Sequence, residues 1–204
     1  MIMEKKTDIN GSRSSILASI KQNQPGSRDL PSLEKFEQPF SNLVEKFTAV
    51  LSAIGGQAVE IDNVEEIIAV LQEQYKDSLR VISLLPEFAA YAEIFRKGDD
   101  PHKLNDVDVA IIKARFAVAE NGAVWVTEDL LHERVLPFIC QHLVVIVNRQ
   151  DFVATMHDAY DIIGTTDYGF ATFIAGPSKT ADIEQSLVLG AHGPKTMQVF
   201  IVTT

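Results

Sequence analysis

A continuous run of apolar residues at positions 143–147 constrains the fold of this chain more than any other feature. A strand with one face in water alternates apolar and polar residues, whereas an unbroken apolar run is typical of a strand covered on both faces. Such strands belong to parallel sheets that carry helices on either side. The run therefore predicts an α/β protein with a mostly parallel sheet.

The segments before this run extend the pattern. Apolar residues recur at helical spacing over 40–54, and a short strand is predicted at 57–61. A helix opened by Asp62 or Asn63 then leads to a strand at 79–83, which would form a βαβ unit with a parallel strand pair.

The second half is richer in strands. Strands are predicted at 107–112, at 116–127 with a tight turn at Asn121-Gly122, at 170–175 and at 198–202, and helices at 150–162 and 180–189. The alternation predicts a three-layer α/β sandwich over residues 39–204. Residues 1–38, punctuated by prolines, are expected to be a flexible arm that could form a short helix at 12–20. An arm without function is as consistent with this composition as one that binds a partner.

Composition narrows the function classes. The formal net charge is -10, which disfavours general nucleic-acid binding because that needs clustered lysine and arginine. The single cysteine, Cys140, cannot form an internal disulfide, a four-cysteine zinc site or an iron–sulfur ligand set, and we expect it to be a small buried hydrophobe. The histidines show no metal-ligand spacing. Without an apolar leader or a spanning segment, the cytoplasm is the expected compartment.

The first candidate for chemistry follows the strand at 170–175. It comprises Gly176, Pro177, Ser178, Lys179, Thr180, Asp182 and Glu184. In open α/β sheets ligands collect at the carboxyl ends of strands, and the free amides of a helix start beside Lys179 would make a modest anion site. An ordinary helix start, capped by Ser178 or Thr180, is the competing interpretation.

The second candidate is the segment from Gly190 to Pro194, in which Gly193 follows His192. Glycines on both sides of a histidine, before a proline, indicate an unusual fixed turn. His192 could shuttle protons or bind a ligand near neutral pH, or it could only satisfy loop carbonyls. We expect the other histidines, His102, His132, His142 and His157, to be surface or structural residues.

The third candidate is Glu120-Asn121-Gly122-Ala123, a carboxylate directly before a turn between two apolar strands. Burial there would raise the pKa of Glu120 and suit it to covalent or acid–base work. A solvated hairpin corner with a type I′ turn at Asn121-Gly122 is the alternative.

Together these segments resemble the lactate-utilisation (LUD) domain family. The closing residues from Gly176 to Glu184, with Gly190 and His192-Gly193-Pro194, are similar to the end of that domain. Arg134, Leu136, Pro137 and residues 142–147 resemble the segment before and within its next strand. Where the family usually shows Glu-Thr-Gly-Thr, this chain keeps Glu120 and Gly122 but lacks both threonines, which weakens any role for threonine hydroxyls.

The resemblance implies a NagB/RpiA/CoA-transferase-like fold and a part in the oxidation of L-lactate to pyruvate beside iron–sulfur partner proteins. It implies no cofactor in this chain itself, and Glu120 and His192 as the residues closest to any chemistry. Two other hypotheses stay open. One is a stand-alone CoA-transferase-like or isomerase-like enzyme that uses Glu120, because Glu-Asn-Gly also resembles the nucleophilic turn of CoA transferases. The other is a sensor of a small carboxylate.

Overall fold

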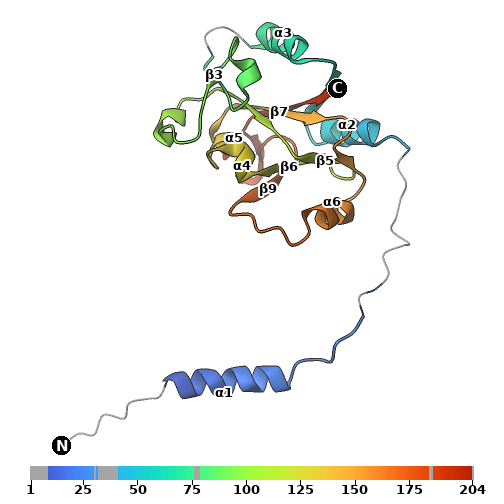
Figure 1. Cartoon of the computed structure of the whole chain (residues 1–204), viewed down its shortest axis with the longest axis vertical. Coiled ribbons are helices and arrows are strands. Elements are labelled where there is room, and N and C mark those ends of the chain that lie inside the picture. Colours follow the sequence, from blue (N-terminus) through green and yellow to red (C-terminus); the bar gives the residue numbers. More distant parts are fainter. Residues whose placement is uncertain (1–8, 30, 32–40, 76–78, 184–185, 204) are drawn as a thin grey trace, which may run out of the picture. The chain divides into compact units, whose positions relative to one another are not determined.

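The computed structural model describes residues 9–29, 31, 41–75, 79–183 and 186–203. The chain divides into two units, Met1–Gln38 and Pro39–Thr204 (Figure 1). In the first unit, helix α1 (Ile9–Gln22) covers the predicted helical residues and exposes Ile16, Leu17 and Ile20. Among the described residues no helix is long and apolar enough to cross a membrane.

The second unit is built on a six-stranded sheet in which every neighbouring pair is parallel. In spatial order its strands are β1 (Gln57–Ile61), β12 (Thr196–Val202), β7 (His142–Asn148), β4 (Val109–Lys113), β2 (Val81–Ser83) and β3 (Glu93–Ile94). The apolar run at 143–147 lies in β7 and is buried throughout. The predicted parallel α/β sheet is confirmed.

Helices cover one face of this sheet. Helix α3 (Val64–Gln74) and the short helix η2 (Pro86–Phe88) pack there, and Ile67, Leu71 and Phe88 meet Val144 and Phe200. Asn63 begins α3 by accepting a hydrogen bond from the Glu66 amide at 2.9 Å, so the second of the two predicted caps is the one used.

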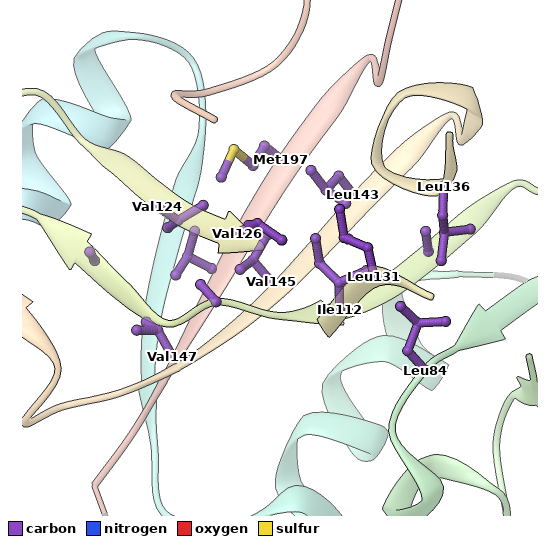
Figure 2. Packing of buried hydrophobic residues seen from close by; sticks show 14 of the residues in the cluster. Leu84, Ile112, Val124, Val126, Leu131, Leu136, Leu143, Val145, Val147 and Met197 are labelled. Carbon is purple, nitrogen blue, oxygen red and sulfur yellow. The ribbon is translucent and has the colours of Figure 1, made fainter. Parts of the chain in front are cut away.

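The opposite face carries the larger core. Helices α2 (Leu43–Ala53), α4 (Glu128–Leu131) and α5 (Leu136–Ile139) pack here together with a second, smaller sheet. Figure 2 shows Val124 and Val126 of that sheet beside Val145 and Met197 of the parallel strands. Cys140 belongs to this core and is buried, as predicted.

The smaller sheet is mixed. Its strands, in order, are β8 (Phe152–Val153), β5 (Phe116–Val118), β6 (Ala123–Thr127) and β9 (Ala171–Ile174). Helix α6 (Met156–Ile163) packs on it through a cluster that contains Phe116, Trp125, Ala159 and Phe173. In Figure 1, α3 and α6 lie on opposite sides of the domain with both sheets between them. The remaining elements are η3 (Pro101–Leu104) and the hairpin of β10 (Lys179–Ile183) and β11 (Ser186–Leu189).

Four local predictions are wrong. β1 and β2 are parallel but not adjacent, because β12, β7 and β4 come between them. The connection from β5 to β6 is a four-residue loop, with Val118 paired to Ala123, and not a type I′ turn: Gly122 has a φ of 69°, whereas Asn121 does not have a positive φ. The predicted helix at 150–162 begins only at Met156, because residues 152–153 pair with β5.

The fourth error concerns the helix predicted at 180–189, where the structure has the hairpin of β10 and β11. The Gly190 amide donates to the Ser178 carbonyl at 3.1 Å, so both ends of this segment lie together. A ten-residue helix would separate its ends by about 15 Å. The chain must therefore reverse its direction between Ser178 and Gly190, which a β-hairpin allows and a single helix does not.

Candidate functional site

The turn that carries Glu120 rests against the end of helix α2. A Cβ on Gly122 would lie 3.1 Å from the backbone nitrogen of Leu51 and 3.4 Å from Cδ1 of Ile54. Asn121 closes the turn by accepting a hydrogen bond from the Ala123 amide at 3.1 Å. A side chain at this position would clash with the helix, and the positive φ of Gly122 also favours glycine. The glycine therefore allows the turn to pack directly against helix α2.

Glu120 itself is exposed, which agrees with the alternative of a solvated corner and not with a buried carboxylate. Its Oε2 accepts a hydrogen bond from the Met156 amide at 2.8 Å, and its own amide donates to Ala154. Met156 is the first residue of α6, where free amides favour a carboxylate. One oxygen of Glu120 thus helps to begin a helix, and Oε1 makes no hydrogen bond within the part of the chain that the structure describes.

The segment from Gly176 onward meets the same end of α2. A Cβ on Gly176 would lie 3.1 Å from the carbonyl oxygen of Ile54, and a Cβ on Gly55 would lie 3.6 Å from Pro177. Lys179 donates a hydrogen bond from Nζ to the Ile54 carbonyl. The lysine therefore stabilises the end of a helix, where a positive charge is favourable, and is not displayed beside a helix start.

The glycine–histidine turn joins this segment. The Ser178 amide donates to the Pro194 carbonyl at 2.8 Å, and a Cβ on Gly193 would lie 3.1 Å from that of Ser178. His192 is exposed, and its ring makes no hydrogen bond or ion pair with the described residues. The structure therefore brings the three predicted segments to one surface around Ile54 and Ser178, which we call the α2-end surface.

The side chains of two predicted site residues lie outside the described part of the structure, so their predicted roles stay predictions. The backbone of Asp182 lies in β10, but its side chain is outside the described part of the molecule, and Glu184 lies outside the described residues altogether. Thr180 pairs with Val188 in the hairpin and caps no helix.

The α2-end surface lies at the opposite edge of the parallel sheet from the one expected. The strand before Gly176 is β9, which belongs to the mixed sheet and runs antiparallel to β6. Pro194 lies two residues before the start of β12, and Gly56 leads directly into β1. The surface therefore adjoins the amino edge of the parallel sheet, by which we mean the edge where its strands begin.

A hollow of about 360 Å³ opens at this amino edge, and none of the predicted site residues lines it. Its walls are Gln74, Tyr75, Leu79, His142 and Thr196. Nδ1 of His142 and Oγ1 of Thr196 are 2.8 Å apart, and the His142 ring lies 5.1 Å from that of Tyr75. Burial lowers the pKa of His142, and the charge of Lys195 lowers it further, with Asp108 opposing both.

A second hollow, of about 660 Å³, lies beside α4. His132 on its wall has a φ of 55° and a ψ of -50°, and the Glu133 amide donates to the Leu131 carbonyl at 2.5 Å. This is a γ-turn with positive φ, a rare and strained conformation. Arg134, also on the wall, pairs with Glu128 at 2.7 Å and lies over the ring of Phe170. Nowhere in the described residues do three or more potential metal ligands gather.

Among solved structures, the chain is similar to the crystal structure of a DUF162 family protein from Deinococcus radiodurans. The TM-score is 0.59 at 16% sequence identity, over 80% of this chain and 99% of that one. A likeness at this level of identity is one of fold, and it defines the class of α/β domain.

The family follows from the sequence: a model of the LUD domain matches residues 44–202, so the chain belongs to the LUD domain family. The resemblance inferred from the closing residues is confirmed.

Among the relatives are proteins named Lactate utilization protein C. That of Anoxybacillus flavithermus is 26% identical over 80% of this chain and 71% of its own length. That of Bacillus subtilis is 31% identical over 52% of this chain and 48% of its own length, and that of Shouchella clausii 35% identical over 43% and 40%. The chain is thus a distant relative of these proteins, and the latter two alignments span less than half of the relative.

Proposed function

We propose that this chain is an accessory or subunit protein of an iron–sulfur-dependent system that oxidises L-lactate to pyruvate. Its relatives are named for lactate utilisation, and this chain matches the family over 44–202. The α2-end surface would hold a small carboxylate or a partner protein, and the iron–sulfur clusters would belong to the partners.

One observation carries this proposal. Two of the three segments that resemble the family lie more than fifty residues apart in the sequence, one with Gly122 and the other with Gly176. Both of these glycines nevertheless pack against Ile54. Gly193 abuts Ser178 in the same way. The missing side chains at these three glycines allow the three segments to pack closely against this chain's own backbone and side chains, which brings them to one surface. The exposed ring of His192 adds a hydrogen-bonding group to that surface.

The arrangement of layers supports a matching proposal for the fold. α3 covers one face of the parallel sheet, and α2 with the mixed sheet covers the other. We propose that the domain is a three-layer sandwich of the NagB/RpiA/CoA-transferase-like kind.

Affinity purification of the tagged full chain from lactate-grown cells tests the function. We expect iron–sulfur proteins to co-purify, identified by mass spectrometry and by iron and sulfide content. His192→Ala is expected to reduce their recovery without changing thermal stability, because the exposed ring makes no hydrogen bond or ion pair with the described residues. His157→Ala, which removes another exposed histidine from α6, is the matched control. Recovery of the chain alone, from cells that oxidise lactate, contradicts the proposal.

A stand-alone enzyme of the CoA-transferase or isomerase kind is the second candidate, favoured by the exposed Oε1 of Glu120 that no described residue binds. In this reaction the carboxylate attacks a CoA thioester carbonyl, which forms a glutamyl anhydride and releases the CoA thiolate. Incubation with a panel of acyl-CoA esters should add the acyl mass to the wild type and not to Glu120→Gln. The absence of any adduct counts against this candidate.

A sensor of a small carboxylate would use the same surface without turnover. It predicts that the ligand raises the melting temperature while no product forms.

A further inference from the structure

The hollow at the amino edge of the parallel sheet is built from the first residues of two adjacent strands. His142 begins β7 and Thr196 begins β12, and the two residues are register partners. Tyr75 follows the last residue of α3 and faces them across the hollow. The volume of about 360 Å³ is at the lower end of the range for small-molecule sites, about 300–1,000 Å³.

Two buried polar atoms at this edge lack partners. Tyr75 is 7% exposed and Gln198 4% exposed, yet Tyr75 Oη and Gln198 Oε1 make no hydrogen bond of normal geometry within the described residues. Gln198 lies two residues after Thr196 and so on the same face of β12. Buried polar groups are almost always satisfied, because an unpaired one keeps its full desolvation penalty. Of the two residues only Tyr75 lines the hollow, and its hydroxyl therefore points to a molecule there that supplies the missing partner.

The described residues that line the hollow are uncharged at neutral pH. Burial raises the pKa of Tyr75, and the Thr196 hydroxyl only partly opposes this effect. Burial and the charge of Lys195 lower the pKa of His142, so its ring is neutral. His142 uses Nδ1 toward Thr196, which leaves Nε2 without a hydrogen bond in the part of the chain described. The walls thus offer neutral donors and acceptors, and Leu79 adds an apolar patch.

A cation, Lys195, stands beside these neutral groups. Lys195 is close enough to lower the pKa of His142, and it forms no salt bridge with any described residue. The glycine–histidine turn holds it in place: Gly190 has a φ of 75°, and a Cβ there would lie 2.3 Å from Cγ of Lys195. The Lys195 amide donates to the Gln141 carbonyl at 2.7 Å. A lysine without a salt bridge at the edge of a partly buried hollow favours an anionic ligand, and the Asp108 charge opposes that effect in part.

We propose that this hollow binds a small hydroxycarboxylate, with the carboxylate toward Lys195 and the His142–Thr196 pair and the hydroxyl hydrogen-bonded to Tyr75. The carboxylate would pair with Lys195, which forms no salt bridge with a described residue, and the hydroxyl would supply the hydrogen bond of normal geometry that Tyr75 Oη lacks. The α2-end surface adjoins this site through Lys195 and Thr196, which follow Pro194 directly. The choice of lactate as first probe rests on the proposed function, but the class of ligand rests on these residues.

Calorimetric titration of the full chain tests the ligand class. L-lactate is expected to bind. Propionate, which lacks the hydroxyl, is expected to bind up to about tenfold more weakly, the effect of one neutral hydrogen bond. Propane-1,2-diol, which lacks the charge, is expected to bind at least about tenfold more weakly, the effect of one charge-assisted hydrogen bond. Equal affinity for all three probes, or no binding of any, overturns the inference.

Variants test the place. Tyr75→Phe and Lys195→Gln are each expected to weaken L-lactate about tenfold, by the same reasoning. Tyr75→Phe removes only an oxygen that makes no hydrogen bond of normal geometry with the described residues, so the protein should fold. Tyr160→Phe and Lys103→Gln change an exposed tyrosine and an exposed lysine elsewhere and should leave the affinity unchanged.

The nuclear magnetic resonance titration of the His142 ring provides a readout at the hollow itself. Tyr75, Thr196, Lys195 and Asp108 surround this ring. A bound carboxylate would favour the imidazolium form, so saturating L-lactate should raise the pKa of His142 in the wild type.

The two proposals fail differently. L-lactate that binds the wild type and the Tyr75→Phe variant equally removes this site and leaves the proposed function standing. Binding that needs Tyr75 and Lys195, in a protein whose loss does not impair growth on lactate, keeps the site and removes the proposed function.

Discussion

Replacing Gly122 with alanine tests whether the Glu120 turn is fixed to the end of helix α2. The residue has a φ of 69°, and a Cβ would lie 3.1 and 3.2 Å from backbone atoms of Leu51. Neither atom can rotate away, because both belong to the helix. A left-handed conformation lowers the free energy of unfolding by about 1–2 kcal/mol when the residue carries a Cβ. Alanine also reduces the conformational entropy of the unfolded chain, which raises the free energy of unfolding by about 0.4–1 kcal/mol and offsets part of that loss.

The close approach adds a second cost, about 1–3 kcal/mol for overpacking against rigid surroundings. We therefore expect Gly122→Ala to lower the free energy of unfolding by about 2–4 kcal/mol in urea titrations. Gly98 is the matched control: its φ is 96° but nothing lies within 4 Å of its missing Cβ, so Gly98→Ala should show only the strain. Equal destabilisation by both substitutions would refute the contact between the turn and the helix.

Three further predictions concern the amino edge. Burial raises the pKa of Cys140 to about 12, so iodoacetamide at pH 8 should alkylate the unfolded chain and spare the folded one, as mass spectrometry would show. Tyr75→Phe should keep or raise the free energy of unfolding, by up to about 1 kcal/mol, because it removes an unsatisfied hydroxyl; a clear loss in urea titration would show that the hydroxyl has a partner. Folding lowers the pKa of His142 below its ordinary value of 6.5, so the folded protein favours the neutral ring. The stability that this preference contributes is fully present above pH 6.5 and is lost as the pH falls toward the pKa of the folded state. The melting temperature of His142→Gln should therefore decline less than that of the wild type over this pH range.

The parallel core was predictable because its signal is local. An unbroken apolar run such as 143–147 can satisfy only a strand with both faces covered, and the structure buries all of it. The order of strands was not predictable in the same way. β12 comes last in the sequence and still separates β1 from β7, since strand order depends on contacts between distant segments.

The hairpin at 179–189 shows the limit of local propensity. Ala181, Glu184 and Leu187 are good helix formers, but the hydrogen bonds of Ser178 to Gly190 and Pro194 close the segment on itself. The start of α6 was readable from Thr155 and Asp158, which form a capping box at a spacing of three.

The candidate site was predictable in part. The residue types singled out the three segments, and the structure brings them together through close approaches at Gly122, Gly176 and Gly193 that the sequence analysis did not predict as a set. The amino-edge hollow gave little sign in the sequence, because His142 and Thr196 are polar residues at strand starts and become neighbours only through sheet register. The chemical roles of Glu120 and His192 stay predictions.

Growth on L-lactate as the sole carbon source tests the central claim most directly. The gene would be deleted in its host and restored as the wild type, as Glu120→Gln or as His192→Ala. Membership in a lactate-oxidation system predicts that the deletion strain fails to grow on lactate, grows on pyruvate and recovers with the wild-type gene, and that the two variants restore growth poorly. A deletion strain that grows normally on lactate, with no second LUD-domain protein present, would contradict the account.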